Sequence, residues 1–429
     1  MVNKQGKAYQ NMKKSYILFL LILCINILAL TGCNEGKDNY KQGLAAYEEG
    51  DYETASKEFK EAISLSPYRG DYFLSYGNTL LKLENYEEAI NIFNQVITDK
   101  DSQEVRQNNK KACYGKGIAY YNIQEYKKAI EQFDLALAIN EIEDMNLDIL
   151  LYKGDSQIAG QLYEDAIETL SLAIDMEPSD PNMYLKRANV YTKLKEYSKA
   201  EADLDEAISQ EPDNYDYYFA KYTLLEEQNK EEEGKRVLDS ITKIKTEDTQ
   251  DIYNNAKANY YLENYEAAES GLITAVLEGI VEGNFYLARI MEEKEEYVEA
   301  ISFYEEFLTI PNDVSEDSED EYIVSDYYMA FSYNQMGYCY LELEQFEQAI
   351  DSFNKGLEIG VSSLEETLLV NKIVALEYSS NYVEAYNVLQ EYITKYPDGE
   401  ETIRELDFVK TRLPEVSTDS TDNGEDGIE

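Results

Sequence analysis

The segment ACYGKGIAYYNIQEYKKAIEQFDLA, residues 112–136, is the clearest copy of a pattern from which nearly the whole chain is built. Its first half carries a small residue at Gly117 among large apolar ones. Its second half carries Tyr126, Ala129 and Phe133 at helical spacing, which places them on one side of a helix. The residues between the two halves are mostly polar, so the chain is expected to turn there. The segment therefore predicts a hairpin of two short helices.

The pattern recurs along the chain around a central small residue. An aromatic residue stands three positions before it in every copy except at Glu231, and a large apolar residue stands four positions after it. Four of the steps between successive copies are 34 residues long. The central positions are Ala55, Ala89, Ala129, Ala166, Ala200, Gly234, Ala268, Ala300, Ala349 and Ala385.

This period and this spacing resemble the tetratricopeptide repeat, a helix–turn–helix unit that stacks into solenoids. The resemblance covers roughly residues 36–398. It implies an all-α fold, a right-handed superhelical solenoid of about ten helical hairpins. The chain departs from the family in having no tryptophan. Other aromatic or aliphatic residues take the family's early aromatic position, and the many tyrosines are expected to serve packing and surface lining.

Residues 1–32 are typical of a lipoprotein signal peptide. Two lysines form a positive flank, and an apolar run of fifteen residues ends at Leu30. That run is shorter than the roughly 20 residues that cross a bilayer, which favours a cleaved leader over a membrane-spanning anchor. The ending LTGC resembles the bacterial lipobox, which implies that Cys33 is acylated. The alternative is an ordinary cleaved leader with an accidental cysteine, and Met12 is an alternative start to Met1.

Further boundaries follow from shifts in composition. Cys33 and a short tether, residues 33–39, lead into the predicted array, residues 40–398. Residues 399–413 form a polar-faced segment suited to capping the last hairpin. The acidic residues 414–429 contain few apolar side chains and are expected to be disordered.

Two stretches interrupt the array. At about 215–248, Glu231 replaces the aromatic residue and Gly234 replaces the alanine. Glycine inside a helix costs about 1 kcal/mol relative to alanine, so this stretch is either a hinge or the product of sequence drift. The second interruption, 312–326, is an acidic insert. Its carboxylates lack the ordered alternation and the glycine of a calcium loop, so a solvated loop is predicted.

Composition narrows the classes of function. The chain has 86 acidic and 38 basic residues, a net charge of −48, and no histidine. Such a surface repels nucleic-acid phosphates, so nucleic acid is excluded as a partner. The lack of histidine removes the usual general base and the commonest transition-metal ligand. We therefore predict no enzyme, no catalytic residue, no cofactor and no metal site.

The resemblance also implies where a partner binds, because the first helices of such hairpins line a concave groove. The Lys and Asn set with which some relatives clamp a terminal carboxylate is not present as a coherent set, so that ligand class is not supported. The predicted groove lining is aromatic with scattered amides. Its residues are Tyr40, Tyr47, Tyr114, Tyr121, Asn189, Phe219, Tyr253, Tyr260, Phe285, Arg289 and Asn334.

The leading hypothesis is an extracytoplasmic scaffold, held to a bacterial cell membrane by lipid on Cys33, that binds a protein or peptide. The acidic charge favours a basic partner. The rival hypothesis is a protein that binds cell-wall glycans or assists a hydrolase, with carboxylates and aromatic platforms as its working parts. Assembly of an envelope complex is a third hypothesis, which the sequence does not separate from general scaffolding.

Overall fold

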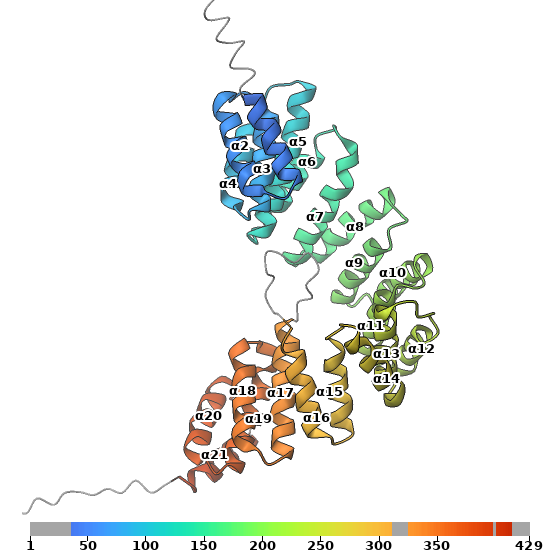
Figure 1. Ribbon diagram of the computed structural model, residues 1–429, viewed down its shortest axis with the longest axis vertical. Helices are drawn as coiled ribbons and strands as arrows, with labels where there is room; N and C mark the ends of the chain where they lie inside the picture. The colour runs from blue at the N-terminus through green and yellow to red at the C-terminus, as the bar shows by residue number, and fades with distance from the viewer. Residues whose placement is uncertain (1–35, 311–324, 398–399, 414–429) are drawn as a thin grey trace, which may run out of the picture. The chain divides into compact units, whose positions relative to one another are not determined.

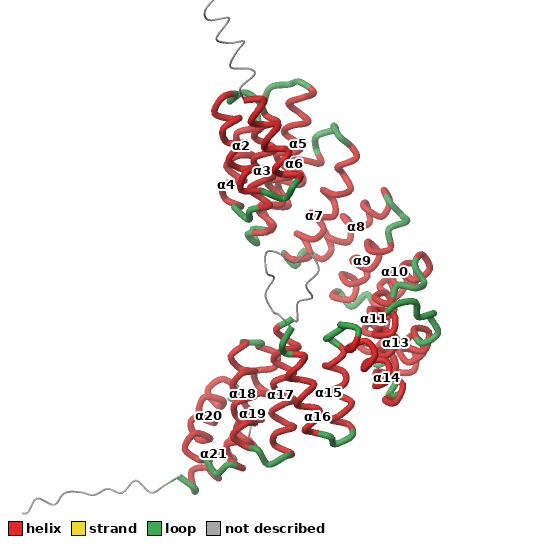
Figure 2. The backbone as a smooth tube through the Cα atoms, in the orientation of Figure 1, coloured by secondary structure: helices red, strands yellow, loops and turns green. Residues whose placement is uncertain are grey.

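The computed structural model describes residues 36–310, 325–397 and 400–413, and these residues form helices without any strand (Figures 1 and 2). The all-α prediction is confirmed. The predicted leader, Cys33, residues 312–324 and the tail 414–429 lie outside the described residues. Among the described helices, none combines the length and the apolar character needed to span a membrane.

A helix over residues 36–48 comes first, and a short 3₁₀ turn, η1 (Glu143–Met145), precedes α7. The others are α2 (Tyr52–Leu65), α3 (Gly70–Lys82), α4 (Tyr86–Val96), α5 (Gln103–Asn122), α6 (Tyr126–Leu137), α7 (Asn146–Ala159), α8 (Tyr163–Met176), α9 (Pro181–Lys193), α10 (Tyr197–Gln210), α11 (Tyr215–Glu227), α12 (Glu231–Ile241), α13 (Thr249–Tyr261), α14 (Tyr265–Leu277), α15 (Gly283–Glu293), α16 (Tyr297–Phe307), α17 (Asp326–Glu342), α18 (Phe346–Ile359), α19 (Ser362–Tyr378), α20 (Tyr382–Lys395) and α21 (Glu400–Lys410).

Each predicted hairpin turns at one residue in the left-handed region, five positions before its central small residue. In the third hairpin this residue is Gln124, whose N–H donates to the carbonyl of Tyr121, while the N–H of Glu125 donates to that of Tyr120, both at 2.9 Å. These bonds satisfy the last carbonyls of the first helix. The ten turn residues have φ between 56° and 81° and are Gly50, Glu84, Gln124, Gln161, Lys195, Asn229, Glu263, Glu295, Glu344 and Ser380.

The central alanines lie where the two helices of a hairpin approach most closely. All nine are fully buried, and so are large side chains four residues later, such as Phe93 and Phe133. The opposite helix makes room with a small residue. A Cβ added to Gly117 would lie 2.3 Å from Phe133 Cε1, so only glycine permits this approach of α5 to α6. The packing is therefore the one that the alternation of small and large residues predicts.

The chain divides into two compact units, an N-terminal unit (residues 1–229) and a C-terminal unit (residues 230–429). The boundary falls inside the stretch 215–248 that the sequence marks as irregular, because α11 belongs to one unit and α12 to the other. Asn229 nevertheless adopts the left-handed turn, and Gly234 is buried in α12. The hairpin register thus persists through the irregular stretch.

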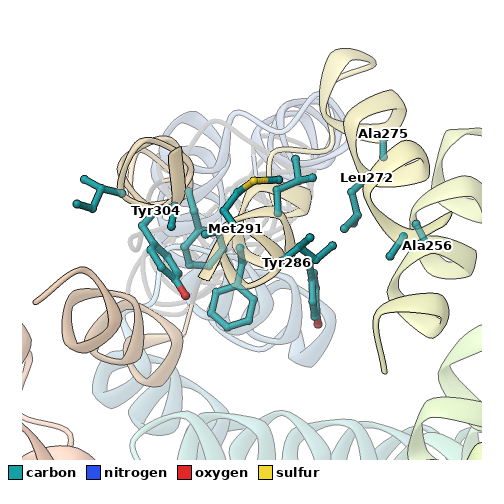
Figure 3. Packing of buried hydrophobic residues seen from close by; sticks show 14 of the residues in the cluster. Ala256, Leu272, Ala275, Tyr286, Met291 and Tyr304 are labelled. Atoms are coloured by element: carbon teal, nitrogen blue, oxygen red, sulfur yellow. The ribbon is translucent and has the colours of Figure 1, made fainter. Parts of the chain in front are cut away.

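Each unit has a core made by its own hairpins. In the C-terminal unit, a large cluster joins α13 to α17, and Figure 3 shows Tyr286, Met291 and Tyr304 among its side chains. At the end of this unit, α21 packs on α20, and its Val409 is fully buried beside Leu389. This arrangement closes the apolar face of the last hairpin.

Candidate protein-binding surface

The first helices of successive hairpins contact one another directly, in addition to contacting their own second helices. Such contacts join α5 to both α3 and α7, and α9 to α11, in the N-terminal unit. They join α15 to α13 and α17 to α19 in the C-terminal unit. First helices therefore form a shared face within each unit. The predicted groove residues lie on these helices, 15, 11 or 8 positions before the central small residue of their hairpin.

An aromatic cluster lies on this face in the N-terminal unit. Tyr152 of α7 makes edge contacts with Tyr114 and Tyr121 of α5, with ring centroids 5.9 and 6.3 Å away, and stacks against Phe133 at 6.2 Å. Tyr152 is 36% exposed. Burial, followed by nearby charges and phenols, raises the pKa of the Tyr114 and Tyr121 hydroxyls, so both stay neutral. We call Tyr114, Tyr121 and Tyr152 the tyrosine cluster.

Acidic side chains border the tyrosine cluster. Asp155 of α7 accepts two hydrogen bonds, at 2.6 and 2.8 Å, from the ammonium group of Lys186 on α9. Asp148, on the same helix as Asp155, lies close enough for its charge to act on Tyr114. The cluster therefore offers apolar rings edged by carboxylates, which suits a ligand with both apolar and cationic groups.

In the first hairpin, the predicted groove tyrosines pack against other aromatic rings, Tyr40 in the next hairpin and Tyr47 within its own. The ring of Tyr40 stacks on Tyr72 of α3 at 4.3 Å, and its hydroxyl lies 3.2 Å from Ser75 Oγ. Tyr47 makes an edge contact with Tyr52 at 5.3 Å. Both side chains are half-buried, so they contribute part of their surface to packing and part to the exposed face.

In the C-terminal unit, the first helices carry a chain of hydrogen-bonded polar groups. Asn371 Nδ2 donates to Asn334 Oδ1 at 2.8 Å, and Asn334 Nδ2 donates to Gln335 Oε1 at 3.0 Å. Gln335 Nε2 then donates to Glu292 Oε2 at 3.1 Å. The chain links α19, α17 and α15, so it fixes three successive first helices against one another.

Glu292 is the charged end of that chain. Its side chain is 7% exposed, it pairs with Arg289, and it accepts a 2.8 Å hydrogen bond from the Tyr304 hydroxyl. Burial raises the pKa of Glu292, while Arg289 and the hydrogen bonds oppose that change. These partners compensate for the loss of water around a buried carboxylate, which assigns Glu292 a structural role.

The predicted groove residues differ in how much surface they present. Asn189 is exposed; Tyr40, Tyr47, Tyr114, Tyr121, Phe219, Tyr260 and Arg289 are half-buried; Tyr253, Phe285 and Asn334 are buried. Tyr152 brings Tyr114 and Tyr121 into one cluster, and Tyr286 contacts both Tyr253 and Tyr260, with ring centroids 6.2 and 5.2 Å away. Phe285 packs among Tyr304, Phe307 and Phe331 and belongs mainly to the core.

Sequence reasoning missed Tyr152 and the polar partners of Asn334. Leu151 occupies the position equivalent to Tyr114, 15 residues before Ala166, so Tyr152 stands one position outside the expected register. Gln335 and Asn371 lie in mostly apolar helices and form no recognisable motif. In the part of the chain that the structure describes, no group of three or more Cys, Asp or Glu is placed to hold a metal ion.

Known proteins with similar sequences contain tetratricopeptide repeats. Sequence profiles of the tetratricopeptide repeat match residues 40–105, 114–183, 151–217 and 330–359. The chain is 24% identical over 190 residues to the bovine BBSome complex member BBS4, covering 44% of this chain and 34% of that protein. It is 26% identical over 200 residues to the Hsp70-Hsp90 organizing protein of Triticum aestivum, covering 40% of this chain and 34% of that protein. It thus spans about a third of the length of these relatives.

A crystal structure of a tetratricopeptide repeat protein from Parabacteroides merdae aligns with 16% identity and a TM-score of 0.46. The alignment covers 62% of this chain and 99% of that one.

Proposed function

This chain is a tetratricopeptide repeat protein, and from that premise we propose that it binds a basic protein or peptide on the face formed by its first helices. A scaffold of this kind is suited to protein–protein interaction. The observation that carries the proposal is the tyrosine cluster, a partly exposed set of rings on that face with carboxylates beside it. A net charge of −48 supports a basic partner, because long-range attraction accelerates association with cations.

The tyrosine cluster and the net charge are expected to control different rate constants. Replacing Tyr114, Tyr121 and Tyr152 by alanine should speed dissociation of the partner by about 100-fold, because short-range aromatic contacts hold the complex together. Raising salt should instead slow association and leave dissociation nearly unchanged. Surface plasmon resonance measures both rates, using a partner recovered by crosslinking in cells and then purified.

Tyr68→Ala is the matched control, because Tyr68 is 96% exposed and lies in the loop between α2 and α3. It should leave both rate constants unchanged. An association rate that does not depend on salt, or an acidic partner, contradicts the basic-partner proposal. Unaltered dissociation from the triple variant contradicts the assignment of the tyrosine cluster.

We further propose that lipid on Cys33 holds the chain to the extracytoplasmic side of a bacterial membrane. The support is the sequence alone: a positively charged flank, an apolar run to Leu30 and the LTGC ending. The hairpins begin at residue 36, so a lipid on Cys33 would hold them within about 10 Å of the bilayer.

Cys33→Ala is expected to abolish lipid attachment, because the acyl chain has no thiol to bond. The protein should accumulate as a longer precursor or appear in the medium. Metabolic labelling with an alkyne-bearing fatty acid, followed by fractionation, measures both outcomes. Cys24→Ala, inside the apolar run, is the control and should be labelled normally. A Cys33→Ala protein that is processed, labelled and membrane-bound like the wild type would refute the anchor.

A further inference from the structure

A pocket of about 310 Å³ lies between α19, α20 and α21 in the C-terminal unit. Most of its wall is apolar, and two carboxyl groups from different helices interrupt it. The lining residues are Val370, Ile373, Val374, Glu377, Leu389, Tyr392 and Glu405. The pocket is large enough to take one long side chain. The apolar wall would contact the stem of such a side chain, and the carboxyl groups would contact a polar group at its end.

The carboxyl groups of Glu377 and Glu405 lie close enough to share a hydrogen bond when one of them is protonated. Glu377 of α19 has one oxygen, Oε1, that is shut off from water and has no hydrogen-bond partner. Burial, together with the neighbouring Glu405 of α21, raises the pKa of Glu377 to about 7. Such an oxygen is costly to leave unpaired, so it is a natural acceptor for a donor that enters the pocket.

The basic group that acts on Glu377, the guanidinium of Arg412, has other partners. Arg412 acts on the charge of Glu377, yet its guanidinium lies 3.4 Å over the ring of Phe408 and donates to the Phe408 carbonyl at 3.2 Å. Tyr392 of α20, which also lines the pocket, donates its hydroxyl to Glu366 at 2.9 Å. Among the residues whose side chains the structure describes, no Lys or Arg lines the pocket.

Within the C-terminal unit, the pocket lies on the face that the first helices form. Val370, Val374 and Glu377 stand 15, 11 and 8 positions before Ala385 in their hairpin. Tyr114 and Tyr121 of the tyrosine cluster stand 15 and 8 positions before Ala129. Equivalent positions of stacked repeats point to the same side within a unit.

We propose that this pocket receives one lysine or arginine side chain of the basic partner. The methylene stem would pack against Val370, Val374 and Tyr392, while the charged end would lie between the carboxylates of Glu377 and Glu405. The inference rests on the proposed function, and it adds a defined site with a defined chemical class of ligand group.

Binding at this pocket should depend on pH in a definite direction. Below about pH 7, Glu377 holds a proton, so the two carboxyl groups carry at most one negative charge. Lysine and arginine stay charged throughout this range. Entry of the cation therefore expels the proton, and affinity should rise as the pH rises through 7 and then level off. One proton titrating near pH 7 corresponds to a gain of about ten-fold between pH 6 and pH 8.

The test uses the full chain and a synthetic probe, a peptide of alternating lysine and alanine, with its fully acetylated counterpart as the uncharged control. Affinity is measured by calorimetry at pH 6 and pH 8. The wild type should bind the lysine peptide about ten-fold more tightly at pH 8, and the acetylated peptide weakly at both. Glu377→Gln and Glu405→Gln should each weaken binding at pH 8 by about ten-fold and abolish the pH dependence.

Glu391→Gln is the matched control, because it removes the same charge from an exposed position of α20. Thermal unfolding of each variant verifies that the fold persists. If Glu391→Gln weakens binding as much as Glu377→Gln, overall charge explains the affinity and the pocket is refuted. If the wild type binds the lysine peptide and neither pocket variant changes affinity or pH dependence, the pocket alone is refuted. If no lysine peptide binds at either pH, the basic partner is refuted together with the pocket.

Discussion

Replacing Ala129 by aspartate is expected to lower the free energy of unfolding by about 4 kcal/mol, the larger of the two stability effects that we predict. Ala129 is fully buried in a cluster with Cys113, Phe133 and Ile149. A carboxylate at this position has neither water nor a partner cation, and its bulk forces α6 away from α5. Urea denaturation, monitored by the circular dichroism of the helices at about 222 nm, measures the change.

The effect should also depend on pH, because burial raises the pKa of the new carboxyl group in the folded state above its unfolded value. As the pH falls, the folded protein takes up the proton more readily, so the loss of stability relative to the wild type shrinks. Leu135→Asp is the control: it introduces the same group on the same helix at a position that is 53% exposed. Equal denaturation midpoints for Ala129→Asp and the wild type would contradict the register of the hairpin.

The sequence predicts the hairpins well because the contacts of a repeat protein are local. Each helix packs on its neighbours along the chain, so small and large residues at fixed spacing determine both the turn and the approach of two helices. This explains why the turn at Asn229 and the buried Gly234 keep the common register although the aromatic residue is lost at Glu231. The local rules that specify a hairpin do not require every position of the pattern.

The candidate surface is less predictable for a physical reason. Residues on the face of a stacked array contact residues of the next hairpin, about 35 residues away along the chain. The sequence of that hairpin varies independently. Tyr152 joins Tyr114 and Tyr121 from one position outside the expected register. The pair formed by Glu377 and Glu405 arises because α21 packs after the last hairpin, where the repeat pattern no longer gives a register.

Gly117→Ala is expected to destabilise the N-terminal unit by about 2 kcal/mol, although alanine is the better helix former. The helix alone would gain about 1 kcal/mol from this change. The new methyl group, however, would lie 2.3 Å from Phe133 Cε1, far inside contact distance. Phe133 is fully buried and stacks against Tyr152, so its ring has no free space to enter. Overpacking of this kind outweighs the helical gain. The midpoint of urea denaturation measures the net change.

A neighbouring hairpin provides the control, because Gly154 faces Leu170 where Gly117 faces Phe133. A Cβ at Gly154 would lie 3.3 Å from Leu170 Cδ2, the movable end of a branched side chain. Gly154→Ala should therefore be neutral or stabilising by up to about 1 kcal/mol. Adding Phe133→Leu to Gly117→Ala copies the Gly154 environment and should recover about 1 kcal/mol beyond the sum of the single changes. If the stability changes of Gly117→Ala and Phe133→Leu are strictly additive, the ring of Phe133 is not what restricts position 117. Only a direct steric conflict would couple the two substitutions.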